Sequence, residues 1–169
     1  MLARGRGANL RRVQIIRAKP SDAATLSAIA WAAKAFWGYP SHWMEQWRKQ
    51  LTITPGFIAE NETFAAVIER RQIAFHALLA TPDALRLEHL WVLPERIGQG
   101  IGRTLFLHAA ERASARGAPN LTIEADPHAE PFYQHMGAVR VGATTAEIDG
   151  CRRQLPLLVF DLTKSGLRF

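Results

Sequence analysis

Residues 90–113 join a hydrophobic strand to an amphipathic helix through a loop with glycine at every second position, Gly98, Gly100 and Gly102. Alternating glycines let the backbone curl so that several N–H groups point into one concavity. The helix that follows adds its own unpaired N–H groups and the positive end of its dipole. The loop is therefore expected to bind a phosphate or pyrophosphate through the main chain.

Three other types of loop have related glycine patterns. A P-loop ends in Gly-Lys-Ser/Thr, whereas Arg103 and Thr104 follow Gly102. A dinucleotide-binding loop has the spacing GxGxxG after the first strand, whereas this loop reads GxGxG and follows several strands. A plain turn from strand to helix requires only one glycine. The loop leaves these alternatives open, and a second motif is needed to choose among them.

Length and composition predict one domain with a full hydrophobic core, because the chain has 169 residues and 48% of them are hydrophobic. We place this domain at residues 13–165. There is no apolar run long enough to span a bilayer and no signal peptide, so no membrane partner is expected. The single cysteine, Cys151, excludes an internal disulfide framework and indicates a reducing compartment. A cytoplasmic location is predicted.

The formal net charge of +6 at first indicates a nucleic-acid-binding protein. However, six basic residues precede the first acidic residue, Asp22, and the rest of the chain holds 15 basic and 15 acidic residues. Residues 1–12 are expected to form a basic, disordered leader ahead of a neutral domain. No nucleic-acid partner is predicted. Association through the leader would show strong salt dependence that disappears when residues 1–12 are removed.

Periodicity and turn residues predict alternating strands and helices in a mixed sheet with helices on both faces, hence an α/β or α+β class. The expected strands are residues 13–19, 63–69, 72–80, 85–92, 121–125, 138–143 and 155–162. The expected helices are residues 21–35, 41–50, 100–116 and 129–136.

A second motif resembles the last motif of the GNAT N-acetyltransferase superfamily, which reads Asn, three residues later Ala, then Phe-Tyr and Gly-Phe. In this chain the matching positions are Asp126, Ala129, Phe132, Tyr133 and Gly137. Residues 90–106 likewise resemble the superfamily's acetyl-CoA signature. Three positions depart from the pattern: Ile97 stands for Gln or Arg, Asp126 for Asn, and Ala138 for Phe. Asp126 lacks the amide donor, so it cannot make the contact that an Asn nitrogen makes with the cofactor.

The resemblance implies a GNAT fold with a six- to seven-stranded, mostly antiparallel sheet. It also implies acetyl transfer from acetyl-CoA to a primary amine of a small molecule or peptide, by direct attack. The alternative is a non-catalytic CoA-binding sensor or interaction module. Dimers are common in the superfamily, so a homodimer is an open expectation. The cofactor-binding residues that it implies are Leu90, Trp91, Val92, Ile97, Gly98, Gln99, Gly100, Ile101, Gly102, Arg103, Thr104, Asp126, Phe132 and Tyr133.

Two side chains are catalytic candidates. Tyr133 matches the tyrosine that the family places near the CoA sulfur, and a phenol with a pKa of about 10 stays protonated at pH 7 and can donate to the leaving thiolate. Glu88 is the candidate base, because strand alternation places it on the same face as Leu90 and Val92. The same rule turns His89 and Trp91 to the other face. Each candidate also has a purely structural interpretation: Tyr133 as an aromatic that packs beside Phe132, and Glu88 as an ordinary carboxylate at a strand end.

The acceptor is expected to lie along an aromatic loop in which Phe36, Trp37 and Tyr39 are crowded without an evident packing reason. Such walls can hold an apolar or cationic amine. Trp43 and Trp47, at i and i+4, are adequately explained as core residues. No metal site is predicted, since the histidines show no ligand spacing with one another or with the cysteine.

Overall fold

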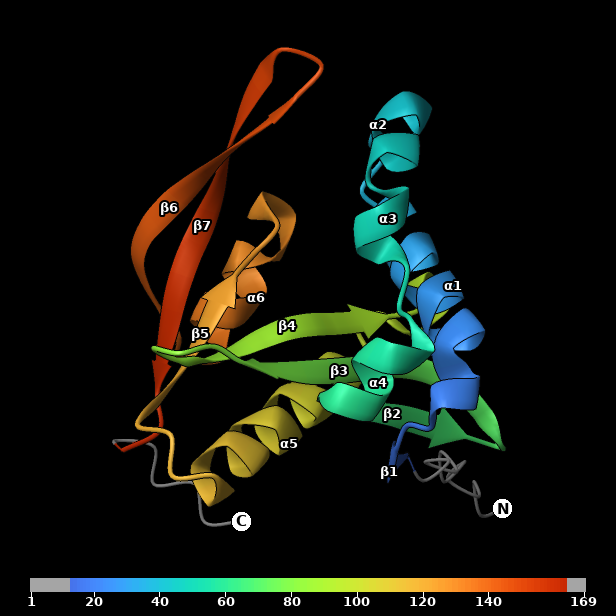
Figure 1. The fold of residues 1–169 in the computed structure, drawn as a ribbon, viewed down its shortest axis with the longest axis vertical. Coiled ribbons are helices and arrows are strands. Elements are labelled where there is room, and N and C mark those ends of the chain that lie inside the picture. The colour runs from blue at the N-terminus through green and yellow to red at the C-terminus, as the bar shows by residue number, and fades with distance from the viewer. Residues whose placement is uncertain (1–12, 164–169) are drawn as a thin grey trace, which may run out of the picture.

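A seven-stranded sheet organises residues 13–163, the part of the chain that the computed structural model describes. The strand order is β1-β2-β3-β4-β5-β7-β6, and every neighbouring pair is antiparallel except β4–β5 (Figure 1). The predicted mixed, mostly antiparallel sheet is confirmed. The predicted leader at 1–12 lies outside the described residues. The strands are β1 (Gln14–Arg17), β2 (Glu62–Ile68), β3 (Arg71–Ala80), β4 (Leu85–Val92), β5 (Asn120–Glu124), β6 (Val139–Ile148) and β7 (Cys151–Asp161).

Helices cover both faces of the sheet, as predicted. The helices α1 and α4 pack on one face and α5 on the other, while α3 packs beside α1 and α2 extends beyond the end of α1 (Figure 1). The helices are α1 (Ala23–Ala35), α2 (Ser41–Gln46), α3 (Arg48–Leu51), α4 (Pro55–Glu60), α5 (Ile101–Ala115) and α6 (Glu130–His135). Three short 3-10 turns are η1 (Pro20–Asp22), η2 (Pro94–Arg96) and η3 (Pro127–Ala129).

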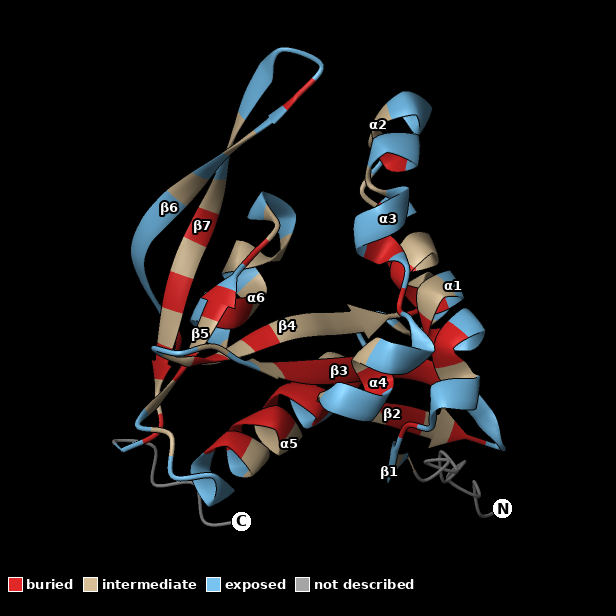
Figure 2. Ribbon diagram, viewed as in Figure 1, coloured by how far each residue is buried: buried red, intermediate tan, exposed pale blue. Residues whose placement is uncertain are grey.

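The strand β3 lies at the centre of the core, where six consecutive residues are buried (Figure 2). One apolar cluster packs α1 and α4 against β2 and β3, with Leu26 and Ile58 almost fully buried. A second cluster packs α5 and α6 against β4, β5 and β7 around Phe106. Between them these clusters fix both ends of β4, the strand that leads into the glycine loop.

The strands β4 and β5 run parallel but are paired only at Arg86 and Thr122. Beyond this pair, towards the carboxyl ends of both strands, the two diverge. Since β5 turns instead to β7 and pairs with it along its whole length, the sheet opens at this point. We call this opening the splay; the main-chain edge of β4 that faces it has no strand partner.

Some element boundaries were predicted wrongly. The helix expected at 41–50 is two helices, α2 and α3, which meet at Trp47. The helix α4 was not predicted, although Thr54 caps it by accepting a hydrogen bond from the Phe57 N–H and Pro55 occupies its first turn. The strands β6 and β7 are longer than the expected 138–143 and 155–162, although the turn that joins them, Asp149-Gly150, is the one that the turn residues of the sequence indicate. Among residues 13–163 no helix is both long and apolar enough to cross a membrane.

Candidate active site

The glycine loop, residues 98–102, takes the conformation that the sequence predicts. Gly98 and Gly100 have φ of +79° and +80°, in the left-handed region that disfavours any residue with a Cβ. Within residues 13–163, the N–H groups of Gly98, Gln99 and Gly100 meet no hydrogen-bond acceptor. The first turn of α5 adds further N–H groups without partners inside the helix. The loop therefore presents several main-chain donors at the positive end of a helix dipole, which suits an anion.

Side chains around the glycine loop add positive charge and little bulk. Arg103 and Thr104 are exposed on the first turn of α5, and Arg96 lies on η2 just before the loop. The Gln99 side chain turns back and donates to the Glu95 carbonyl at 3.0 Å. Ile97, at the position where the resemblance led us to expect Gln or Arg, is 47% exposed and has no polar side-chain atom.

The free edge of β4 offers a second set of main-chain groups. The Leu93 N–H donates to the Ile73 carbonyl on β3 at 2.9 Å. Because N–H groups alternate in direction along a strand, those of Val92 and Leu90 point the other way, towards the splay. These two positions were predicted to hold a ligand through their backbone, and their N–H groups are oriented for it.

Glu88 lies in a β-bulge, which the argument from strand alternation did not take into account. Leu78 and Ala77 are adjacent on β3, but their partners on β4, Leu87 and His89, are two residues apart. Glu88 is therefore the extra residue, and simple alternation fails here. Its carboxylate lies 2.6 Å from the Arg86 Nε. The predicted shared face of Glu88 with Leu90 and Val92 thus rested on a regular strand that does not exist.

His89 and Trp91 lie on the face of β4 that α4 covers, opposite to α5, as alternation predicted for both. Trp91 Nε1–H donates to His89 Nδ1 at 3.1 Å, so the proton of the neutral imidazole sits on Nε2. The His89 ring also meets the edge of Phe57 on α4. Burial lowers the pKa of His89 to about 4, and the Arg86 charge adds to this. His89 is therefore a neutral, packed side chain at pH 7.

Tyr133 on α6 is buried against the second apolar cluster. Its ring packs near Phe106 and Phe132, at centroid distances of 6.0 and 5.1 Å. Burial raises the pKa of Tyr133, so the phenol is protonated at neutral pH. No residue within 13–163 hydrogen-bonds to its hydroxyl, which remains available as a donor. A Cβ added at Gly102 would lie 3.4 Å from the Phe132 ring, so α5 and α6 meet closely beside the glycine loop.

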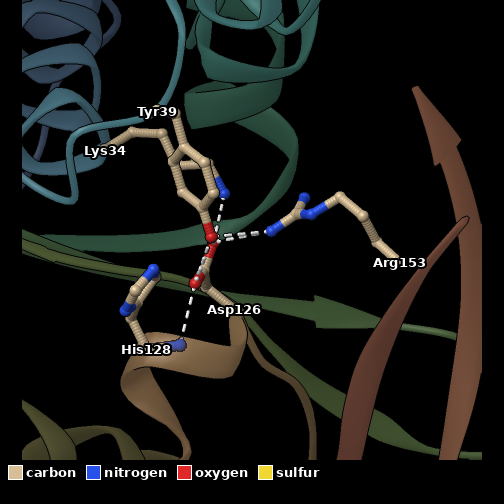
Figure 3. A network of polar contacts seen from close by, with 5 residues as sticks. All are labelled: Lys34, Tyr39, Asp126, His128 and Arg153. Carbon is tan, nitrogen blue, oxygen red and sulfur yellow. Dashed lines mark hydrogen bonds and ion pairs between the residues drawn. The ribbon is translucent and has the colours of Figure 1, made fainter. Parts of the chain in front are cut away.

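Four side chains form what we call the Asp126 cluster: Lys34 of α1, Tyr39 of the α1–α2 loop, Asp126 just after β5, and Arg153 of β7 (Figure 3). The Asp126 carboxylate accepts from the Lys34 ammonium, from the Tyr39 hydroxyl at 2.9 Å and from the His128 N–H at 2.9 Å. Arg153 Nη2 donates to the Tyr39 oxygen at 2.7 Å and reaches Asp126 Oδ2 at 3.4 Å. The cluster ties α1 to β5 and β7 across the splay.

Burial and charge compete within this cluster. Burial lowers the pKa of Lys34, and Asp126 offsets this only in part. Burial alone would raise the pKa of Asp126, but the Lys34 charge, the His128 N–H and the Tyr39 hydroxyl together bring it below its usual value. Burial, followed by the Asp126 charge, raises the pKa of Tyr39. At pH 7 the carboxylate is ionised and the phenol is protonated.

The aromatic loop is better packed than the sequence indicated. Trp37 stacks on His128 with ring centroids 5.0 Å apart, and Tyr39 belongs to the Asp126 cluster. Phe36 is the most open of the three, because it is 54% exposed and meets the Trp37 ring edge-on with centroids 5.5 Å apart. The expectation that this loop had no packing reason is wrong for Trp37 and Tyr39.

Sequence reasoning missed Lys34 and Arg153 and placed Asp126 only with the cofactor. The one local signal was Lys34, a lone charge in an otherwise apolar stretch of α1. Trp43 and Trp47, explained from the sequence as core, stand beside the Asp126 cluster, and Tyr39 meets the Trp47 ring edge-on at 5.0 Å. No set of three or more His, Cys, Asp or Glu side chains within the described residues could hold a metal ion.

Solved structures of similar fold are numerous. A GCN5-related N-acetyltransferase from Rhodopseudomonas palustris superposes with a TM-score of 0.73 at 25% identity, covering 88% of this chain and 94% of that one. The PaiA N-acetyltransferase from Thermoplasma acidophilum, solved in complex with coenzyme A, gives a TM-score of 0.71 at 18% identity, covering 89% and 99%.

A curated relative also matches by sequence. Streptothricin acetyltransferase from Streptomyces lavendulae is 35% identical in an alignment of 98 residues that covers 54% of this chain and 52% of that protein. The match thus spans about half the length of this relative. Residues 22–154, from η1 into β7, match the family described as acetyltransferase (GNAT) domain. This match includes the glycine loop, the splay and α6, and the chain belongs to the GNAT acetyltransferase family.

Proposed function

We propose that the protein transfers an acetyl group from acetyl-CoA to a primary amine of a small molecule or peptide. The observation that carries this proposal is the glycine loop, whose unpartnered N–H groups stand where β4 and β5 part. A pyrophosphate bound there would direct the rest of the thioester along the free edge of β4. The coenzyme A bound in the Thermoplasma acidophilum protein of the same fold supports this choice of ligand.

The reaction forms a C–N bond and breaks a C–S bond. The neutral amine attacks the thioester carbonyl carbon, the sulfur leaves as a thiolate, and the amide nitrogen gives up a proton. The N–H groups of Leu90 and Val92 point into the splay, where they can orient the thioester and stabilise charge on its carbonyl oxygen. The Tyr133 hydroxyl, protonated and without a protein partner, can donate to the sulfur.

Deprotonation of the acceptor is the remaining requirement. An alkylammonium with a pKa of about 10.4 is neutral in only a few molecules in ten thousand at pH 7, a barrier of about 4–5 kcal/mol. Glu88 is the proposed base, directly or through water. The bulge moves its carboxylate off the face of Leu90 and Val92 and beside Arg86, so an amine that approaches from the α1 and α4 side would meet it.

Calorimetric titration with acetyl-CoA tests the ligand. Gly100→Ala forces a Cβ into a left-handed backbone conformation, which costs about 1–2 kcal/mol, and the loop should leave that conformation. We expect Kd to rise about 5- to 30-fold. Gly117→Ala is the matched control, because Gly117 has φ of +75° and equal open space but lies at the far end of α5. Equal binding by both variants and the unchanged protein would contradict the assignment.

Thiol release from acetyl-CoA in the presence of a panel of amines tests the reaction. Turnover with at least one amine is expected. Tight, Gly100-dependent binding without turnover of any amine would instead favour a CoA-binding sensor.

A further inference from the structure

The Asp126 cluster holds more positive than negative charge. The Lys34 and Arg153 side chains are each 11% exposed and that of Asp126 is 7% exposed. Among residues 13–163, Asp126 is the only carboxylate in contact with either cation. Two cations therefore share one anion in a nearly buried site. A buried charge without a counter-ion is costly, so the cluster is electrostatically incomplete by one negative charge.

The hydrogen-bonding capacity of the cluster points in the same direction. Both oxygens of Asp126 are occupied: Oδ1 accepts from Tyr39 and the His128 N–H, and Oδ2 from Lys34, with Arg153 beyond it. Arg153 uses only Nη2 within the described part of the chain, which leaves Nε and Nη1 as donors without an acceptor. The cluster thus has few free acceptors for the hydrogen bonds of an incoming ammonium, but it has free N–H donors for hydrogen bonds to an incoming anion.

The aromatic rings at the Asp126 cluster, which could attract a cationic acceptor, already face the cations of the cluster itself. Lys34 Nζ lies 4.3 Å from the Trp47 ring centroid and 4.9 Å from that of Tyr39. The Arg153 guanidinium lies over the same two rings at 4.8 and 4.9 Å, and 5.9 Å from Trp43. These cation–π contacts also fix the plane of the guanidinium, and a fixed, planar fork suits a carboxylate.

The cluster adjoins the proposed reaction site. Asp126 directly follows Ala125, whose N–H bonds to the Pro156 carbonyl of β7. It also caps η3, which leads into the helix that carries Tyr133. A group held by Arg153 would therefore belong to the acceptor rather than to the phosphates, which the glycine loop binds through its main chain.

We propose that the acceptor amine also carries a carboxylate, and that Arg153, held in place by Tyr39 and Asp126, binds that carboxylate. This inference rests on the proposed acetyl transfer. It names a class of acceptor, which two sources can supply: a free amino acid, or a peptide with its terminal carboxylate.

The first test compares matched acceptors with the unaltered protein. Each amino acid is paired with its carboxamide and with the corresponding decarboxylated amine, and dipeptides are paired with their amides. We expect the acids to have kcat/KM about 10- to 100-fold higher than their amides, as for loss of a charged hydrogen bond. The free amino acids and the dipeptides distinguish the two sources. Equal or better turnover of the amides, or a preference for polycationic amines, would overturn the proposal.

The second test changes the protein. Arg153→Gln should remove the preference for acid over amide and leave the KM for acetyl-CoA unchanged, whereas Arg153→Lys should keep part of the preference. Arg152→Gln is the matched control, because Arg152 is the exposed neighbour on β7. Thermal unfolding of each variant verifies the fold. A preference that survives Arg153→Gln in a folded protein would contradict the assignment.

Binding separates failure of this inference from failure of the proposed function. Titration of the CoA-saturated protein with each acid and its amide measures acceptor affinity without turnover. If acetyl-CoA binds but no amine is acetylated, the proposed function fails, and a tighter binding of acids that Arg153→Gln abolishes still supports the carboxylate site. If amines are acetylated and bound without regard to the carboxylate, only the present inference fails.

Discussion

Acidification should destabilise the protein well before its carboxylates are protonated, because one buried histidine and one half-buried histidine are held in the neutral form. His76 on β3 is fully buried; its Nε2 lies 2.8 Å from His108 Nδ1 on α5, and its Nδ1 has no partner within 13–163. Burial lowers the pKa of His76 to about 3, with the charges of His108 and Arg112 adding to the effect. His89 behaves likewise, with a pKa of about 4.

The sign and size follow from linkage. Both histidines bind protons in the unfolded chain below a pKa of about 6.5 but not in the folded one, so their contribution is complete above that pH and is lost as the pH falls towards the folded values. At pH 5 each histidine favours the unfolded state by about 2 kcal/mol. The free energy of unfolding should therefore fall by about 4 kcal/mol between pH 7.5 and 5, a substantial part of a typical domain's stability of about 5–15 kcal/mol. The lowered pKa of His108 acts in the same direction.

Urea denaturation at a series of pH values measures this fall. His89→Gln keeps an acceptor for the Trp91 N–H but does not titrate, so it should remove about half of the pH dependence. The exposed His135 supplies the control His135→Gln, which should leave the dependence unchanged. A fall of less than about 1 kcal/mol in the unaltered protein, or an identical slope in His89→Gln, would refute the reasoning.

Three further predictions concern the site. Tyr133→Phe should lower kcat about 100-fold with little change in the KM for acetyl-CoA, since only the donor to the leaving sulfur is lost; steady-state kinetics with an unchanged kcat would remove that role. Asp126→Asn leaves the cations of Lys34 and Arg153 without an anion and should lower the free energy of unfolding, measured in urea, by about 3–5 kcal/mol. A loss of less than about 1 kcal/mol would show instead that both charges are well solvated. Gly102→Leu should cost about 1–3 kcal/mol by crowding Phe132, whereas Gly102→Ala fits, and equal stabilities would show that α5 and α6 are not closely packed there.

The parts of the site that the sequence predicted are those in which neighbouring residues determine the geometry. The positive φ values of Gly98 and Gly100 follow from the residue type and from their place between a strand and a helix. The stop of α5 at Gly117 follows from the same rule. For these elements a local motif is sufficient, and tertiary contacts only confirm it.

The parts that the sequence did not predict depend on contacts between distant segments. In the Asp126 cluster, Lys34 is 92 positions and Arg153 is 27 positions away from Asp126 along the chain, and no local pattern pairs them. The bulge at Glu88 is invisible for a related reason: alternation assumes that each residue of β4 has one partner on β3, and only the pairing itself reveals the extra residue.

This contrast between local and distant contacts also separates the two halves of the proposed reaction. The glycine loop and the edge of β4 offer main-chain N–H groups, which most substitutions of the surrounding side chains leave in place. The Asp126 cluster consists of four side chains from four segments, and each can change without altering the loop. Acceptor preference can therefore vary while the proposed CoA site is retained. A family resemblance that rests on the loop and on α6 accordingly supports the proposed donor, whereas the acceptor has to be inferred from the charges and hydrogen bonds of this particular chain.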